Sequence, residues 1–202
     1  MLSLDPTNNT ERENYKLLIG SIIPRPIAFV TSLTENDTVN AAPFSYFNIV
    51  SSNPPMISVS AQRRDGKQKD TARNILGKKE FVIHIVDESN VVEINKTAAT
   101  LSPNESEIAL TSLTLIDSEQ VSVPGVKEAK VRMECTLEQV IELGEDGSIG
   151  TDLIIGKIVR FHIDEEIYHD GKIDPIKLGA LSRLAGTNYA KIGDIFAMER
   201  PK

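Results

Sequence analysis

Two long stretches in the second half of the chain most constrain its fold. From residue 131 to 143 (VRMECTLEQVIEL) apolar and polar residues alternate, and DLIIGKIVRFHID follows after the turn sequence GEDGS. A period of two is typical of a β-strand with one apolar face, so we predict two long antiparallel strands here. The polar residues, Arg132 and Glu134 among them, fall on the opposite face. Gly156, in the second stretch, is a candidate for a bulge or a close approach.

Shorter patterns extend this reading to the rest of the chain. Residues 27–33, 56–62 and 81–86 are short β-branched or aromatic runs bounded by proline, glycine, asparagine or charge, which predicts strands. Capping-box spacing predicts short helices that start near Thr10 and Ser102, and residues 89–99 are compatible with a third. Many short strands with few helices indicate an antiparallel barrel or sandwich.

Composition excludes several classes of protein. A chain of 202 residues favours one domain, and no apolar run approaches the length of a membrane helix. The start of the chain lacks the pattern of a signal peptide, and a single cysteine, Cys135, leaves no internal disulfide, so we expect a cytoplasmic protein. The net charge of −7 argues against nucleic acid as the main partner. Membrane association is not expected either.

The clearest chemical signal is the segment QRRDGKQKDTARNI, residues 62–75. Basic residues are concentrated there in an otherwise acidic chain, and Asp70-Thr71 is a plausible helix start with Asp70 as its cap. The free N–H groups of a helix start, a neighbouring lysine and a threonine hydroxyl together suit a phosphate monoester. The alternative is a solvated basic loop beside a surface helix. The basic residues are Arg63, Arg64, Lys67, Lys69 and Arg73.

A second signal is the run NAAPFS at residues 40–45, which interrupts an apolar region with two alanines and a proline. Small side chains would allow a flat polar ring system to lie close to the backbone. The alternative is an irregular edge strand in which proline deters pairing with another chain. Asn53-Pro54-Pro55 is expected to form the rigid turn before the strand that ends near Ser60.

Six blocks in this order resemble the flavin reductase-like family of FMN-binding split barrels: PRPIAFVTS, NAAPFSYF, SSNPPMISVS, KDTARNI, EFVIHIV and RLAGTNY. The resemblance covers about residues 15–196. It implies one domain over residues 1–202, mainly β, with an antiparallel Greek-key split barrel as its core at about 15–165 and a few short helices. Residues 166–202 would pack on the barrel or on a dimer partner. It also implies a homodimer with FMN at or near the subunit interface.

The resemblance also implies which residues contact FMN. Hydroxyl groups after the first barrel strand would face the flavin, the 40–45 segment would lie along the ring, and the lysine-aspartate-threonine block would hold the phosphate. Arg183 and Tyr189 would lie beside the ring or the dimer partner. Two departures from the family pattern are His84 in place of asparagine and Ala185 in place of glycine. The expected FMN contacts are Thr31, Ser32, Asn40, Ala41, Ala42, Pro43, Phe44, Ser45, Ser60, Arg64, Lys69, Thr71, Arg183 and Tyr189.

The function implied is an NAD(P)H-dependent oxidoreductase in which NADH or NADPH reduces FMN, with flavin or a flavoprotein as acceptor. One alternative is an FMN-containing electron carrier without its own NAD(P)H activity, and another is a barrel that serves as a binding or assembly module. No catalytic residue is identified, because hydride transfer depends on positioning more than on an acid or base. The three histidines are widely spaced, so we expect structural or surface roles and no metal site. Cys135 is expected to be buried and inert.

Overall fold

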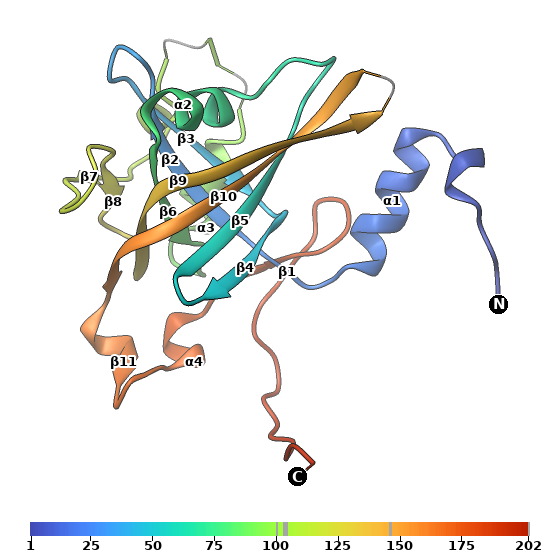
Figure 1. The fold of residues 1–202 in the computed structure, drawn as a ribbon. Helices are drawn as coiled ribbons and strands as arrows, with labels where there is room; N and C mark the ends of the chain where they lie inside the picture. The colour runs from blue at the N-terminus through green and yellow to red at the C-terminus, as the bar shows by residue number, and fades with distance from the viewer. Residues whose placement is uncertain (100, 103–104, 146, 202) are drawn as a thin grey trace.

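The computed structural model describes residues 1–99, 101–102, 105–145 and 147–201, and its largest element is a seven-stranded antiparallel sheet (Figure 1). The strand order is β3-β2-β6-β9-β10-β5-β4, so β3 and β4, neighbours in the sequence, are the two end strands of a split barrel. The predicted mainly β, Greek-key split barrel is confirmed. The strands are β2 (Ala28–Leu33), β3 (Val39–Phe44), β4 (Phe47–Ser52), β5 (Pro55–Gln62), β6 (Glu80–Ile85), β9 (Val131–Glu145) and β10 (Ser148–Ile163).

The hairpin of β9 and β10 is the long antiparallel pair that the alternation predicts. The register of this pair shifts between Ile155 and Gly156, and a β-carbon on residue 156 would collide with the ring of Phe81. Both expectations for Gly156 are therefore met at one position. The core cluster beneath the sheet includes Phe81, Val59 and Ile154, all fully or almost fully buried.

The described residues include four α-helices. Thr10 caps α1 (Glu11–Ser21) through the predicted capping box with Glu13, and α2 (Asp70–Lys78) packs on β2, β3, β6 and β9. The helix predicted over 89–99 is α3 (Val91–Lys96), and α4 (Pro175–Leu178) is a single turn near the C-terminus. The helix start proposed at Ser102 runs into residues 103 and 104, which lie outside the described residues. Across the described ranges, no helix combines the length and apolar character needed to cross a membrane.

Short pairs of strands complete the fold. β1 (Arg25–Pro26), β13 (Ser182–Arg183) and β14 (Tyr189–Ala190) form a small antiparallel sheet that links the start of the chain to its C-terminal region. Residues 191–201 have no regular secondary structure and extend away from the barrel (Figure 1). The remaining elements are β7 (Leu115–Ile116), β8 (Gly125–Val126), β11 (Tyr168–His169), β12 (Lys172–Ile173), η1 (Pro6–Asn8), η2 (Glu107–Leu110) and η3 (Glu165–Ile167).

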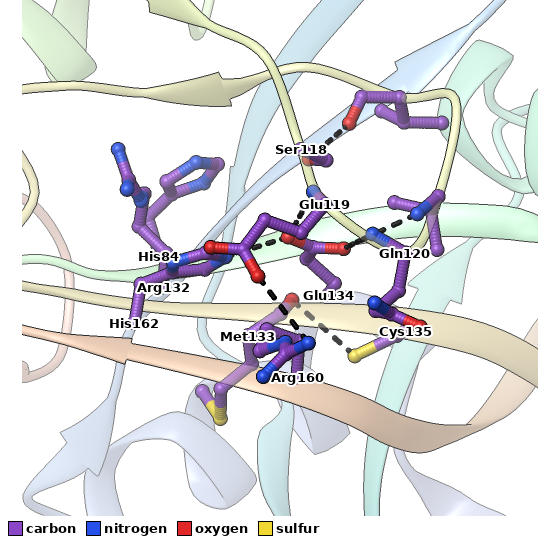
Figure 2. A network of polar contacts seen from close by, with 12 residues as sticks. His84, Ser118, Glu119, Gln120, Arg132, Met133, Glu134, Cys135, Arg160 and His162 are labelled. Carbon is purple, nitrogen blue, oxygen red and sulfur yellow. Dashed lines mark hydrogen bonds and ion pairs between the residues drawn. The ribbon is translucent and has the colours of Figure 1, made fainter.

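Glu134 departs from the simple two-faced pattern of β9, because its side chain is fully buried although it lies on the polar face. Figure 2 shows the reason: the backbone nitrogens of Glu119 and Gln120 point at its carboxylate, at 2.8 and 2.6 Å, and the nitrogen of Val121 lies 3.2 Å away. His162 Nε2 lies 2.6 Å from the same carboxylate. These hydrogen bonds hold the pKa of Glu134 below its ordinary value despite the opposing effect of burial.

His84, on the neighbouring strand β6, is also fully buried, and both of its ring nitrogens have partners. Its Nδ1 lies 2.9 Å from the carbonyl oxygen of Phe29, and its Nε2 accepts a hydrogen bond from the backbone nitrogen of Val126 at 2.8 Å. This pattern requires a neutral ring with its proton on Nδ1. Burial lowers the pKa of His84 to about 4. We call Glu134, His84 and His162 the polar centre; Glu134 and His84 lie on the sheet face opposite the main core, where backbone groups of residues 119–121 and 126 bind them. The contacts of His84 fit a structural role.

Candidate functional site

A pocket with a volume of about 380 Å³ lies where α1, the small sheet, α3 and the ends of β3 and β5 meet. Aromatic rings form part of its wall, and hydroxyl and amide groups form another part. The three charged side chains in its lining are Lys69, Arg25 and Arg183. We call it the cationic pocket. The other lining residues used below are Tyr15, Pro43, Phe44, Ser45, Tyr46, Ser60, Gln62, Asn95 and Tyr189.

The charge of this pocket is opposite to that of the whole chain. Three cations line it and none of its lining residues is aspartate or glutamate, whereas the chain carries a net charge of −7. Cations without acidic neighbours repel one another, and burial makes that repulsion costly. A ligand with negative charge would remove this cost, so the pocket is suited to an anion.

Lys69 lies at the start of α2, and its ammonium nitrogen is 5.2 Å from the centre of the Phe44 ring. Although part of the residue stays exposed, partial burial lowers the pKa of its ammonium group. Among the described residues, no side chain caps the N-terminus of α2. Its first-turn N–H groups therefore stay available to a ligand. The prediction that Asp70 caps the helix is wrong: Asp70 is its first residue and pairs with Arg73 at 2.6 Å.

The other four basic residues of the 62–75 segment do not line the cationic pocket. Arg63 binds the buried carboxylate of Asp152 at 2.6 Å, and it also pairs with Glu142. Arg64 and Lys67 form an exposed turn outside the pocket lining. Of the five clustered basic residues, Lys69 is the one that lines the pocket, so the solvated-loop interpretation fits the turn and the anion-site interpretation fits the helix start.

Several expected FMN contacts form an internal hydrogen-bond network instead of lining the pocket. The Thr71 hydroxyl donates to Asn40 Oδ1 at 2.8 Å, and Asn40 Nδ2 donates to the carboxylate of Glu107 at 2.9 Å. Thr31 donates to the carbonyl oxygen of Pro124 at 2.7 Å, and Ser32 lies 3.3 Å from Asn40 Oδ1. These hydroxyl protons already have protein acceptors. In this structure the Thr71 hydroxyl donates to Asn40, and its contact with a phosphate stays a prediction.

The NAAPFS run divides between core and pocket. Ala41 is fully buried in a core cluster with Phe29, its backbone nitrogen donates to Glu107, and Ala42 packs on the main core. Only Pro43, Phe44 and Ser45 of this run line the pocket. We therefore assign the small size of the two alanines to core packing. Contact of their backbone with a ligand stays a prediction.

Arg25 and Tyr46 are pocket residues that the sequence analysis did not single out. The buried Nε of Arg25 and the buried hydroxyl of Tyr46 have no hydrogen-bond partner among the described residues. Burial raises the pKa of the Tyr46 hydroxyl, and Tyr15 adds to this effect. Unsatisfied buried donors are rare in folded proteins, and these two line the same pocket, so they are suited to a polar ligand there. A signal for Arg25 exists in the sequence, since it is a charge between two prolines directly before a buried strand.

The C-terminal residues close one side of the pocket. The Arg183 guanidinium lies 4.5 Å from the centre of the Tyr189 ring, and its Nη2 donates to the carbonyl oxygen of Gly186 at 2.6 Å. The Tyr189 hydroxyl lies 3.3 Å from Asn95 Oδ1 of α3. The structure thus brings Arg183 and Tyr189 together with Ser60, Lys69 and the 43–45 segment, and leaves Arg64 outside. Aromatic faces, unused donors and three cations fit a flat ring system that carries a phosphate.

The fold defines a split-barrel protein, and aromatic rings and three cations line its pocket. The chain belongs to the family described as flavin reductase like domain, which it matches over residues 19–177. It is 53% identical over 193 residues to YwrF of Bacillus subtilis (strain 168), covering 94% of each chain.

Two solved structures extend the comparison. Nitrilotriacetate monooxygenase component B from Bacillus cereus superposes with a TM-score of 0.96 at 59% identity, covering 98% of each chain. The 2-nitrobenzoate 2-nitroreductase NbaA from Pseudomonas fluorescens has a TM-score of 0.89 at 28% identity, covering 99% of this chain and 96% of the other.

Proposed function

We propose that this protein is an FMN-binding oxidoreductase that uses NADH or NADPH to reduce its flavin and passes electrons to free flavin or to a flavoprotein. The observation that carries the proposal is the pocket that combines aromatic walls with three cations and no acidic residue. An anionic heteroaromatic cofactor matches the aromatic walls and gives Lys69 a counter-ion, whereas an uncharged ring would leave all three cations without one. The similarity to a monooxygenase component and to a nitroreductase supports the same class of redox chemistry.

The residues fit FMN in two parts. Lys69, the free N–H groups at the start of α2 and the hydroxyl of Ser60 would hold the phosphate, since each offers a positive charge or a hydrogen-bond donor. Phe44 and the backbone around Ser45 would lie along the ring system. The bound flavin would supply hydride-accepting chemistry, and the protein would bind it, orient it and keep water from one face.

We also propose a cytoplasmic homodimer in which the C-terminal segment packs on the partner. Apolar side chains are exposed on three parts of the chain: Leu18 of α1 is 52% exposed, Ile49 of β4 is 77% exposed and Phe196 of the C-terminal segment is 80% exposed. Such surfaces on a small protein are typical of protein contacts. Cys135 is fully buried, and burial raises its pKa, so a reactive surface thiol is not part of the proposal.

The test is the visible spectrum of the purified protein with FMN, followed by anaerobic addition of NADH and then NADPH. Bleaching by one of the nucleotides, with sustained turnover when free flavin is supplied, is the expected result. Bleaching by dithionite alone would favour an electron carrier. A protein that stays colourless and gains no thermal stability from FMN would contradict flavin binding, because a ligand of the folded state must stabilise that state.

A further inference from the structure

Arg25 and Arg183 face each other across the small sheet. They are direct partners in the antiparallel pairing of β1 with β13, and both line the cationic pocket. Directly opposite residues in an antiparallel pair project from the same face, and like charges at such positions are destabilising. A pair of arginines in this register therefore needs a compensating negative charge.

The protein itself does not supply that charge. Arg25 is only 7% exposed, and its terminal nitrogens donate to the carbonyl oxygens of Ile19, Ile22 and Leu184 at 2.6–3.0 Å. Arg183 donates to the carbonyl oxygen of Gly186. Within the described ranges, no carboxylate lies within ion-pair distance of either guanidinium.

A purely structural role accounts for only part of this arrangement. Arg25 binds the last carbonyl groups of α1, where a cation is favourable, and so fixes the helix beside the pocket. This role leaves the buried Nε of Arg25 without a partner, and it gives no reason for a second arginine directly opposite. Arg183 also stays partly exposed, with its guanidinium on the face of Tyr189. The unused donors therefore belong to a binding surface.

This arginine pair and Lys69 belong to different parts of the pocket. Lys69 is the N-cap residue of α2 and lies over Phe44, whereas the pair lies on β1 and β13, with Arg183 over Tyr189. Two cationic groups in one pocket suit two anionic groups. A single phosphate monoester at the start of α2 leaves the arginine pair without a counter-ion.

We propose that Arg25 and Arg183 form a second anion subsite, which binds the diphosphate of the nicotinamide dinucleotide donor. This assignment rests on the proposed function and deepens it. A diphosphate has two adjacent oxyanions, and the planar donor set of a guanidinium matches an oxyanion well. The Asn95 amide and the Tyr46 hydroxyl, in the same lining, provide further polar contacts for the sugars of such a ligand.

The test uses the Arg183→Gln variant of the full chain saturated with FMN, because Arg25 also holds α1 and its replacement would disturb the fold. ADP-ribose, which carries the diphosphate but not the nicotinamide, is titrated by calorimetry. We expect its affinity to fall at least tenfold and the KM for the preferred nicotinamide donor to rise by a similar factor, with a smaller rise in the Kd of FMN. Arg183→Lys should recover part of the affinity, since it keeps the charge but loses the planar donor set.

The matched control is Arg160→Gln, which removes one positive charge from an exposed arginine of β10 that pairs with Glu119. It should leave every parameter within twofold. An unchanged ADP-ribose affinity in Arg183→Gln, or no binding of ADP-ribose to the wild type at millimolar concentration, would overturn the subsite. Equal losses of FMN and ADP-ribose affinity would also overturn it, because Arg183 would then belong to the flavin site.

Failure of the proposed function gives a different pattern. If the protein oxidises neither NADH nor NADPH but still binds ADP-ribose in a manner that depends on Arg183, the subsite stands and the reductase activity is wrong. If benzoate displaces ADP-ribose more effectively than inorganic pyrophosphate does, the subsite prefers a carboxylate and the diphosphate assignment is wrong.

Discussion

The polar centre and the cationic pocket are two regions where charge or polarity is buried, and they differ in how completely it is satisfied. The carboxylate of Glu134 accepts hydrogen bonds from three backbone nitrogens and contacts His162, and both ring nitrogens of His84 have partners. In the pocket, by contrast, the Nε of Arg25 and the hydroxyl of Tyr46 have none among the described residues. A complete set of partners fits a structural role, and two donors without partners in the lining of one pocket fit a ligand site.

The comparison teaches that burial alone does not identify a functional residue. Fully buried His84 and Glu134 would attract attention in a search for perturbed titrating groups. Burial and hydrogen-bond partners within the protein explain the shifted pKa values of both groups without a ligand. Lys69, which is less buried, and the paired arginines line one pocket, and none of the three makes an ion pair with the described residues.

Replacement of Glu134 by alanine should have the largest effect and should act on stability alone. Three backbone N–H groups and His162 would lose their acceptor, so we expect the free energy of unfolding to fall by about 4 kcal/mol. Urea unfolding at neutral pH measures this change. Glu138→Ala is the matched control, because Glu138 is exposed on the same strand, and it should cost less than about 0.5 kcal/mol. A loss below about 1 kcal/mol in Glu134→Ala would contradict the structural role.

His84 should make stability depend on pH in a defined window. Burial lowers its pKa from an ordinary value of 6.5 to about 4 in the folded state, so only the unfolded chain binds this proton between these two values. Stability should therefore be complete above pH 6.5 and should fall by about 3 kcal/mol as the pH decreases to 4. His84→Asn should flatten this slope in urea unfolding measured at several pH values, and the exposed His169→Asn should not. An unchanged slope in His84→Asn would show that other groups dominate.

Lys69→Ala should have the smallest effect on stability and a selective effect on ligands. The Kd of FMN should rise about tenfold, or about 1.4 kcal/mol, while the Kd of riboflavin should stay within about twofold, because only FMN has the phosphate. Fluorescence titration of both ligands measures the difference, with Lys67→Ala, on the exposed turn, as the control. The free energy of unfolding without ligand should not fall, since burial lowers the pKa of Lys69 and its charge is not stabilised there. Equal losses for both ligands would place Lys69 away from the phosphate.

Much of the fold could be predicted because its signals are local. Alternation over 131–143 predicted β9, the capping box at Thr10 predicted α1, and the Asn53-Pro54-Pro55 turn joins β4 to β5 as expected. The family relationship could also be inferred from the sequence, because six separate sequence blocks resemble those of the family. The burial of Glu134 could not be predicted from the alternation, because it depends on a loop at residues 119–121 that covers the polar face of β9.

The candidate site was only partly predictable. Lys69, Arg183 and Tyr189 line the pocket as expected, whereas Thr71 and Asn40 turn inward to Glu107, a residue more than 30 positions away in the chain. A side chain with two possible hydrogen-bond partners takes the one that the packed fold brings near, and sequence order does not reveal this choice. Arg25 and Tyr46 were missed for the same reason, because their lack of partners is a property of the assembled pocket.

The sequence by itself determined the strands, the turns, the acidic net charge and the resemblance to flavin reductase-like split barrels, because periodicity, turn residues and charge are properties of short segments. Only the tertiary structure decided which charges are satisfied. It paired Arg63 with Asp152, surrounded Glu134 with backbone N–H groups and set Arg25 opposite Arg183. The energy of a charge depends on neighbours from distant parts of the chain, so the division between structural and ligand-binding residues appears only when those parts are packed together.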